Sequence, residues 1–432
     1  MRSRTPKVMH AVGGCPMLGH VLKTVRTSGA TRFAVVVGPD ATDVRAFVKR
    51  QTPDVAVYKQ AERLGTAHAV LAARSEFKNN PDDVIVAYGD TPLLTAVTLK
   101  RLRTALGKGS DLVVLGFRSA DPTGYGRLIV DNGRLVAIRE EKDADRAERM
   151  VDFCNAGVMG FRGRLAPLLK KIGNGNAKGE YYLTDLVALA RVAGMTAVAL
   201  EGDETEFLGV NSRVELAAAE RAFQDRARRA AMEAGATLVA PETVWFSYDT
   251  KLGHDVIVEP NVFFGPGVTV GEGALIRANS HIDGASVGRG AIVGPFARLR
   301  PDADIRANAH IGNFVEVKNA QIGEGAKVNH LTYVGDAKVG AGANLGAGTI
   351  TCNYDGFDKH PTVIGAGAFI GSNSALVAPV TIGGGAYIAT GSVITMDVPA
   401  DAMAVARGRQ ENKPGWAAKL RDKKRGRRSR RS

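Results

Sequence analysis

An aliphatic residue recurs every six positions through the C-terminal half of the sequence, with an occasional step of five. A period of six suits a short strand followed by a turn, and it does not match the 3.6-residue period of a helix. Three such hexads close one triangular coil, and stacked coils bury the recurring side chains in a continuous column. The pattern therefore predicts a parallel β-helix whose inward residues are Val258, Phe264, Val270, Ile276, Ile282, Val287, Val293, Leu299, Ile305, Ile311, Val317, Ile322, Val328, Val334, Val339, Leu345, Thr351, Ile364, Ile370, Leu376, Ile382, Ile388 and Ile394.

One insert interrupts this period. Residues 352–363 (CNYDGFDKHPTV) form a polar stretch with turn-forming residues at its start. Such an excursion from a solenoid often builds a binding site against a neighbouring coil or subunit. The insert favours a binding function, whereas the repeat taken alone fits a non-enzymatic hexapeptide scaffold equally well.

The N-terminal half alternates β-branched runs with helical stretches, which is typical of a mostly parallel sheet with helices on both faces. Asn132-Gly133 predicts the turn of a hairpin. An Ala-rich helix that stops at Gly235 would connect the two halves. We expect strands at 33–37, 84–87, 112–117 and 197–200, helices at 16–27, 97–106 and 213–234, and the hairpin at 126–140.

Chain length and net charge constrain the domain organisation. The 432 residues favour more than one domain, because single cores rarely grow past about 250–300 residues. The net charge is +13, but residues 421–432 contribute +7 of it through eight basic residues and one acidic residue. With no interleaved aromatic side chains, this block predicts a solvated, disordered tail and no specific nucleic-acid partner. The expected segments are 1–212, the connecting helix 213–235, the β-helix 236–412 and the tail 413–432.

No apolar run approaches the roughly 20 residues that cross a bilayer, so no membrane partner is expected. The three cysteines are odd in number and widely spaced, which indicates free thiols in a reducing compartment. Both features favour a cytoplasmic protein.

Ten blocks of the sequence carry a family resemblance. In the first half these are PKVMHAVGGCPM (6–17), QAERLGTAHAV (60–70), YGDTPLL (88–94), DPTGYGR (121–127), GEYYLTD (179–185) and GVNSR (209–213), which resemble sugar-nucleotide pyrophosphorylases. In the second half GPFARLRP (294–301), IGNFVEVK (311–318), NHLTYVGD (329–336) and GAGTITCNYDG (346–356) follow in order. Together they resemble the bifunctional bacterial N-acetylglucosamine-1-phosphate uridyltransferase/glucosamine-1-phosphate acetyltransferases over nearly the whole chain.

The resemblance implies an α/β Rossmann-like nucleotidyltransferase domain followed by a left-handed parallel β-helix, assembled as a homotrimer. The expected reactions are acetyl transfer from acetyl-CoA to glucosamine-1-phosphate and then uridylyl transfer from UTP. The final product would be UDP-N-acetylglucosamine, a cell-wall precursor, with release of pyrophosphate.

The start of the chain departs from the family pattern. The family opens with a strand and a loop of the form L-x-x-G-x-G-T-R-M, whose backbone N–H groups hold nucleotide phosphates. Here Met1 matches the last residue of that motif. We therefore expect an N-terminal truncation that leaves uridylyl transfer in doubt, with an acetyltransferase carrying a vestigial first domain as the alternative.

His330 is the expected general base of acetyl transfer, because an imidazole exchanges protons near neutral pH and can take one from the sugar ammonium. Glu316 is expected to orient it. The resemblance assigns Arg300, Lys318, Tyr333 and Asn344 to the sugar phosphate and ring. It places Asn353 and Tyr354 over the sugar and acetyl group, and it lines the coenzyme A channel with Ala347, Ser372, Thr390 and Arg407.

In the first domain, Asp90 follows a predicted strand, at the sheet edge where open α/β sheets bind ligands. A carboxylate there suits Mg²⁺ bound to phosphates. The resemblance pairs Asp90 with Asn211 as the metal site and assigns Lys7 to the phosphates, Gln60, Gly65 and Thr66 to uracil, and Gly126, Glu140 and Asn155 to the sugar.

Overall fold

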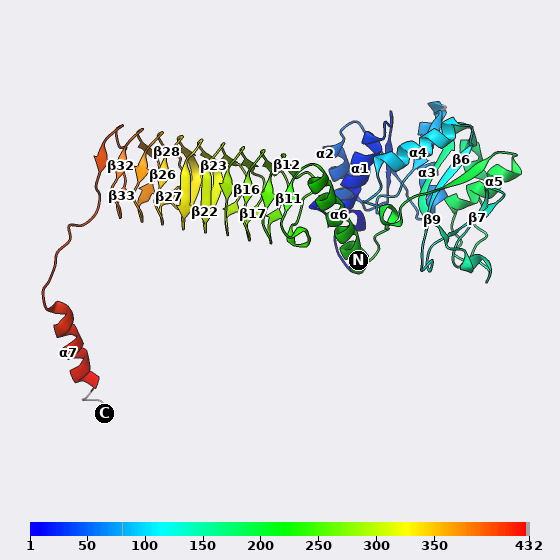
Figure 1. Cartoon of the computed structure of the whole chain (residues 1–432). Coiled ribbons are helices and arrows are strands. Elements are labelled where there is room, and N and C mark those ends of the chain that lie inside the picture. The colour runs from blue at the N-terminus through cyan, green and yellow to red at the C-terminus, as the bar shows by residue number, and fades with distance from the viewer. Residues whose placement is uncertain (80, 429–432) are drawn as a thin grey trace. The chain divides into compact units, whose positions relative to one another are not determined.

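The computed structural model describes residues 1–79 and 81–428. The chain divides into two compact units, Met1–Ala230 with Phe246–Tyr248, and Ala231–Trp245 with Asp249–Ser432. Figure 1 shows a mixed α/β arrangement in the first unit and short parallel strands stacked in the second. No helix in these described stretches is long and apolar enough to cross a membrane.

The first unit is built around a six-stranded sheet of order β10-β6-β9-β7-β8, with β5 paired to β9. The prediction of a mostly parallel sheet is wrong, because β9 runs antiparallel to β5, β6 and β7, and only β10 and β6 are parallel. The strands are β5 (Asp83–Val86), β6 (Leu112–Arg118), β7 (Arg127–Asp131), β8 (Arg134–Arg139), β9 (Phe153–Arg162) and β10 (Ala197–Glu201).

The first unit also contains two separate two-stranded sheets. Strands β3 (Ala34–Val37) and β4 (Ala56–Lys59) pair in parallel as a separate sheet. Strands β1 (Ala11–Val12) and β2 (Cys15–Pro16) form a short antiparallel ribbon. The predicted hairpin is confirmed as β7–β8, with Asn132 and Gly133 at φ +48° and +74° in its turn.

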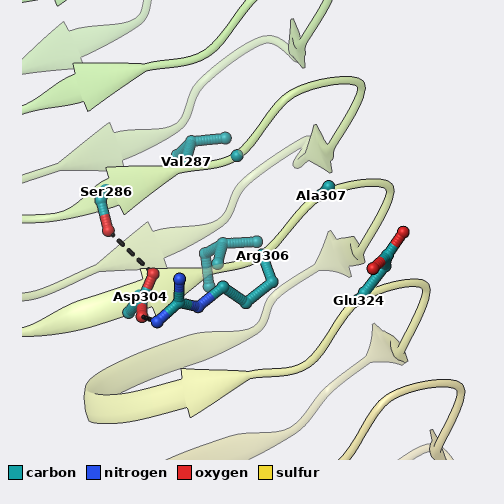
Figure 2. Close-up of a pocket in the computed structure, with 8 residues that line it drawn as sticks. Ser286, Val287, Asp304, Arg306, Ala307 and Glu324 are labelled. Atoms are coloured by element: carbon teal, nitrogen blue, oxygen red, sulfur yellow. Dashed lines mark hydrogen bonds and ion pairs between the residues drawn. The ribbon is translucent and has the colours of Figure 1, made fainter.

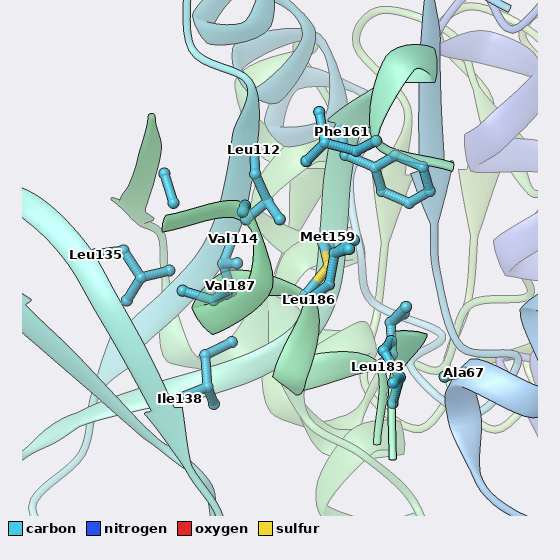
Figure 3. Packing of buried hydrophobic residues seen from close by; sticks show 14 of the residues in the cluster. Ala67, Leu112, Val114, Leu135, Ile138, Met159, Phe161, Leu183, Leu186 and Val187 are labelled. Carbon is cyan, nitrogen blue, oxygen red and sulfur yellow. The ribbon is translucent and has the colours of Figure 1, made fainter. Parts of the chain in front are cut away.

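Helices cover both faces of the six-stranded sheet. Alternate residues of β6 point to opposite sides, so Leu112 and Val114 pack with Leu186 of α5, while Val113 packs with Leu102 of α4. Figure 3 shows the first of these two cores. The helices are α1 (Met17–Thr27), α2 (Thr42–Gln51), α3 (Thr66–Ala72), α4 (Ala96–Gly107), α5 (Leu186–Val192) and α6 (Arg213–Glu233), with 3-10 turns at Lys7–Met9, Arg74–Asn79, Glu148–Met150, Gly163–Lys171, Leu183–Asp185, Glu204–Phe207 and Pro241–Thr243.

The second unit is a parallel β-helix, and every one of the predicted inward side chains is buried. Its 10-stranded sheet runs β11-β13-β16-β19-β22-β24-β26-β29-β32-β34, and a 14-stranded sheet holds the others. The first comprises Thr237–Leu238, Ile257–Val258, Leu275–Ile276, Ile292–Val293, His310–Asn313, Lys327–His330, Asn344–Leu345, Phe369–Ile370, Tyr387–Ile388 and Met403–Ala404. The second comprises Lys251–Leu252 (β12), Phe263–Phe264 (β14), Thr269–Val270 (β15), His281–Ile282 (β17), Ser286–Val287 (β18), Arg298–Leu299 (β20), Ala303–Ile305 (β21), Glu316–Ile322 (β23), Tyr333–Val339 (β25), Ile350–Cys352 (β27), Thr362–Ile364 (β28), Ala375–Val377 (β30), Val380–Ile382 (β31) and Val393–Ile394 (β33).

A column of glycines explains how closely the coils stack. Gly271 and Gly340, for example, each follow an inward residue, and a Cβ added there would lie 2.7 and 2.4 Å from backbone nitrogen of the next coil. Contacts this short are not tolerated, so the tight corner requires glycine. This requirement accounts for the recurrent Ile-Gly and Val-Gly pairs of the repeat.

The C-terminal segment differs from expectation. Trp416–Arg428 forms helix α7, so the disorder predicted for residues 421–432 is wrong for 421–428, while 429–432 lie outside the described residues. The stretch is rich in Ala, Leu, Lys and Arg, which favour helix. The side chains of residues 413–424 are exposed, as expected for a strongly basic segment.

Candidate active sites

The predicted base and the predicted coenzyme A residues lie along one edge of the β-helix, on successive coils. His330 ends β24 and pairs with Asn313 at the end of β22. The carbonyl oxygens along this edge accept N–H groups from the following coil: His330 from Gly348 (3.2 Å), Ala347 from Asn373 (2.7 Å) and Ser372 from Gly391 (2.8 Å). The Arg407 guanidinium then donates to the Thr390 carbonyl at 2.8 Å. We call this row, from Asn313 to Arg407, the edge column.

His330 is exposed, and its Nδ1 lies 2.7 Å from Oδ1 of Asn313. An amide oxygen can only accept, so Nδ1 carries the proton and the lone pair of Nε2 is available as a base. The expectation that Glu316 orients His330 is wrong. Glu316 instead accepts from Arg300 at 2.9 Å and from Arg298 at 3.4 Å, because the coil register places it beside Tyr333.

Three cations from the 14-stranded sheet and the insert loop lie within electrostatic range of one another. The strand pairing brings Arg300 and Lys318 onto neighbouring rungs, since the Arg300 N–H donates to the carbonyl of Val317 at 2.9 Å. Lys359, on the insert loop, approaches Lys318 and lowers its pKa through hydrogen bonding and repulsion, with Arg300 adding to the effect. Sequence reasoning missed Lys359. Three cations held together in this way favour an anion with several oxygens.

The other predicted acetyl-site residues lie on strands β25 and β26 and on the insert loop. Tyr333 begins β25, and its hydroxyl lies so close to Gly335 that a Cβ there would be 2.3 Å away. Asn353 is buried at the start of the insert loop, whereas Tyr354 is exposed and donates from its hydroxyl to the Gly356 carbonyl at 2.7 Å. Asn344 lies on β26 in the 10-stranded sheet, three residues before Ala347 on the edge column.

In the first unit, Lys7, Asp90 and Asn211 converge. The Lys7 ammonium donates to Oδ2 of Asp90 at 2.5 Å and to Oδ1 of Asn211 at 2.8 Å. The N–H of Val210 donates to the Asp90 carbonyl at 3.0 Å, which fixes the Asn211 loop against the strand end. A carboxylate oxygen and an amide oxygen are thus aimed at one cation, and this donor set fits Mg²⁺.

The residues predicted to contact uracil also come together. The Gln60 amide donates to the Gly65 carbonyl at 3.0 Å, and the Thr66 hydroxyl accepts from the Leu183 N–H at 2.9 Å. Gly65 has φ +111°, and a Cβ there would lie 2.6 Å from the Tyr181 carbonyl oxygen, so no other residue fits. The loop is therefore held by backbone geometry that only glycine permits.

The predicted sugar contacts form a third group. The N–H of Asn155 donates to the Gly126 carbonyl at 2.7 Å, and a Cβ on Gly126 would lie 3.5 Å from a Glu140 carboxylate oxygen. Burial raises the pKa of Glu140, although Lys178 and the Thr184 hydroxyl partly oppose this.

Tyr88, which sequence reasoning missed, links the three groups. Burial raises its pKa to about 12, the Thr66 hydroxyl bonds to it, and the charges of Glu140 and Asp90 reach it. Its ring packs closely against Gly157, where a Cβ would be 2.7 Å away. Tyr88 could have been identified from the sequence, because it stands two residues before Asp90 at the end of the predicted strand.

A shallow hollow of about 490 Å³ lies elsewhere on the β-helix (Figure 2). Of the two carboxylates that line it, Asp304 and Glu324, Asp304 is already bound by Ser286 at 3.0 Å, Gln321 at 3.2 Å and Arg306 at 2.7 Å. None of the predicted substrate-binding, coenzyme-binding, catalytic or metal-binding residues lines it, so it is not part of either candidate site.

Comparisons with known proteins agree with this architecture. A family model described as MobA-like NTP transferase domain matches residues 1–171, and one for the bacterial transferase hexapeptide, six repeats, matches residues 249–284 and 361–395. Over 98% of this chain and 94% of the relative, the sequence is 63% identical to the bifunctional protein GlmU of Azorhizobium caulinodans. With the same coverage it is 60% identical to that of Xanthobacter autotrophicus and 58% to that of Agrobacterium fabrum.

These matches correct one expectation. Because they cover 98% of this chain and 94% of the relative, they do not support the predicted truncation. The doubt about uridylyl transfer, and the alternative of a vestigial first domain, rested on that prediction and are likewise not supported. The chain carries both a nucleotidyltransferase domain and an acyltransferase-type hexapeptide domain, and it belongs to the bifunctional GlmU family.

Proposed function

We propose that the chain acetylates glucosamine-1-phosphate at the β-helix and uridylylates the product, N-acetylglucosamine-1-phosphate, at the first unit. The observation that carries the first half is the edge column. Its imidazole lies in line with the residues expected to hold acetyl-CoA, and the cations Arg300, Lys318 and Lys359 support an anionic substrate.

Acetyl transfer follows from these groups. The phosphate of glucosamine-1-phosphate would bind Arg300, Lys318 and Lys359, which leaves the sugar amine near the edge column. His330 Nε2 would take a proton from the ammonium, because only the neutral amine carries a lone pair. A C–N bond then forms at the thioester carbonyl and the C–S bond breaks. Of the two protons that the ammonium nitrogen loses, one leaves through His330 to solvent and the other passes to the departing thiolate.

Ala347, Ser372 and Thr390 follow His330 along the column, and Arg407 lies at its far end. Strands of a sheet are about 4.8 Å apart, so Thr390, three coils beyond His330, is roughly 14 Å from it. An extended thioester laid along this edge would therefore have its acetyl group at His330 and a phosphate at Arg407.

Uridylyl transfer would use the first unit. Gln60, Gly65 and Thr66 would hold the uracil of UTP, and Gly126, Glu140 and Asn155 the sugar. Asp90 and Asn211 would hold Mg²⁺, which when bound supplies positive charge that neutralises the phosphates. Lys7 would contact the same phosphates. A sugar-phosphate oxygen attacks the α-phosphorus of UTP, and pyrophosphate leaves.

We further propose a homotrimer in the cytoplasm, in which neighbouring β-helices complete each coenzyme A site. The exposed edge column supports this, because Thr390 and Arg407 are open to solvent in the single chain. Light scattering should give three times the mass of one chain, and an active monomer would refute the proposal.

His330→Ala tests the acetyl-transfer half. We expect roughly a 10²–10⁴-fold loss of acetyl transfer, the usual contribution of a general base. Uridylyl transfer, assayed on the same protein, should be unchanged. His281→Ala is the matched control, because His281 is also exposed on a β-helix strand but lies away from the edge column. Acetyl transfer by His330→Ala at the wild-type rate would show that another group is the base.

A further inference from the structure

We propose that Asp336 is a positioning residue for the sugar-phosphate end of the acetyl-transfer site, and that it acts through Asn353 and the insert loop. The inference rests on the proposed function, because it assigns that loop to the sugar phosphate. Asp336 does not itself belong to the cation cluster.

The Asp336 carboxylate joins three successive coils. Oδ1 accepts from the Asn319 side-chain amide at 2.6 Å, and Oδ2 accepts from the Asn353 side-chain amide. Each partner lies 17 residues away, one coil before and one coil after. Asn319 and Asp336 both have positive φ, +44° and +48°, so the two residues sit at equivalent bends of their strands. We call this stack the Asn–Asp–Asn ladder.

The last member of the ladder starts the insert loop. Asn353 is 7% exposed, and its carbonyl accepts the N–H of His360 at 2.8 Å, which closes the base of the loop. Within the loop, Tyr354 and Lys359 pair as an isolated antiparallel bridge. The bond from Asn353 to Asp336 therefore fixes the base from which Tyr354 and Lys359 project.

Charge gives Asp336 a second influence on the same region. Burial opposes its ionisation, but the amides of Asn319 and Asn353 and the charges of Lys359 and Lys318 outweigh burial and lower its pKa. The carboxylate is therefore charged at neutral pH. It attracts both lysines, whose mutual repulsion would otherwise move Lys359 away from Lys318.

Asp336→Asn keeps the size of the side chain but removes its charge and one acceptor. The substituted side chain presents one acceptor oxygen and one donating NH2 group where the carboxylate presents two acceptor oxygens. The amide donor that faces the NH2 group therefore loses its acceptor. Charged hydrogen bonds are strong enough that their loss typically costs roughly ten- to a hundredfold in an equilibrium constant. We expect the KM for glucosamine-1-phosphate to rise by about that factor, with the KM for acetyl-CoA and the rate of uridylyl transfer unchanged.

Asn319→Ala is the matched control. It removes the other partner of the same carboxylate but does not touch the insert loop, so its KM for glucosamine-1-phosphate should stay near wild type. An equal rise of this KM in both variants, or a parallel rise of the acetyl-CoA KM, would show that Asp336 merely holds the coils together. An unchanged KM in Asp336→Asn would overturn the proposal outright.

If Asp336→Asn does not fold, Asp336→Gly removes the same carboxylate at a φ of +48°, which glycine adopts without strain, and it should show the same selective rise in KM. An unchanged KM there would also overturn the proposal. Failure of the proposed function can be told apart from failure of the Asp336 proposal. In the first case His330→Ala retains acetyl transfer, whatever the KM of the Asp336 variants.

Discussion

The bond between Asn313 and His330 offers the sharpest test of the acetyl-transfer site. Asn313→Ala removes the side-chain hydrogen bond to Nδ1 of the imidazole, 2.7 Å long. A hydrogen bond of this kind contributes about 0.5–1.5 kcal/mol, so kcat should fall roughly two- to twelvefold. That loss is far smaller than the loss expected from removing the base itself.

The charge-changing variant Asn313→Asp separates orientation from packing. A carboxylate beside Nδ1 favours the protonated imidazole, so the base form of His330 should appear only at higher pH. The acidic limb of the kcat/KM profile for acetyl transfer should therefore move to higher pH, while the uridylyl profile stays where it is. When either Asn313 substitution is combined with His330→Ala, the rate of acetyl transfer should be no lower than in His330→Ala alone, because Asn313 acts through His330.

The measurement is steady-state acetyl transfer across pH, followed by the release of coenzyme A thiol. Wild-type kcat in Asn313→Ala together with an unmoved profile in Asn313→Asp would refute the orienting role. An additive effect in the double variant would show that Asn313 acts elsewhere.

Three further predictions concern the rest of the chain. Gly65→Ala should destabilise the first unit by about 1–3 kcal/mol in denaturant unfolding, because φ is +111° and the new Cβ would meet Tyr181; wild-type stability would contradict this geometry. Asp90→Asn should raise the Mg²⁺ concentration needed for uridylyl transfer at least about tenfold and leave acetyl transfer intact, and an unchanged Mg²⁺ titration would remove Asp90 from the metal site. Deleting residues 421–432 should leave both activities near wild type in kinetic assays, since the side chains of residues 421–424 are exposed, and a raised KM for acetyl-CoA would show a role for the tail instead.

The β-helix was predictable because one repeated contact determines it. Each inward residue meets the equivalent residue of the next coil, as Val317 meets Val334, so a periodic sequence encodes the fold directly. The first unit offers no such repetition. Strand β9 was missed because Gly157 and Gly160 interrupt it and because it is buried on both faces, so no alternation of polar and apolar residues marks it.

Some site residues were likewise predictable from the sequence and others were not. Those within matched motifs, such as Asp90 and Asn211, were brought together as expected. Glu316 was assigned to His330 wrongly because the coil register was not applied to single side chains. A step of 17 residues back from His330 leads to Asn313, whereas the same step from Tyr333 leads to Glu316. Lys359 was not identified from the sequence because its position depends on the path of the insert loop, which interrupts the six-residue repeat.

The regular stacking of the coils fixes the spacing of the residues along the edge column. Because every coil advances the chain by one strand spacing of about 4.8 Å, the distance from His330 to Thr390 can change only in whole increments. Substitutions cannot tune it by fractions of an ångström, and gaining or losing one coil would shift the far end beyond the reach of a hydrogen bond. Under the proposed function, the number of coils therefore sets the distance between the two ends of the acyl donor that the edge column contacts.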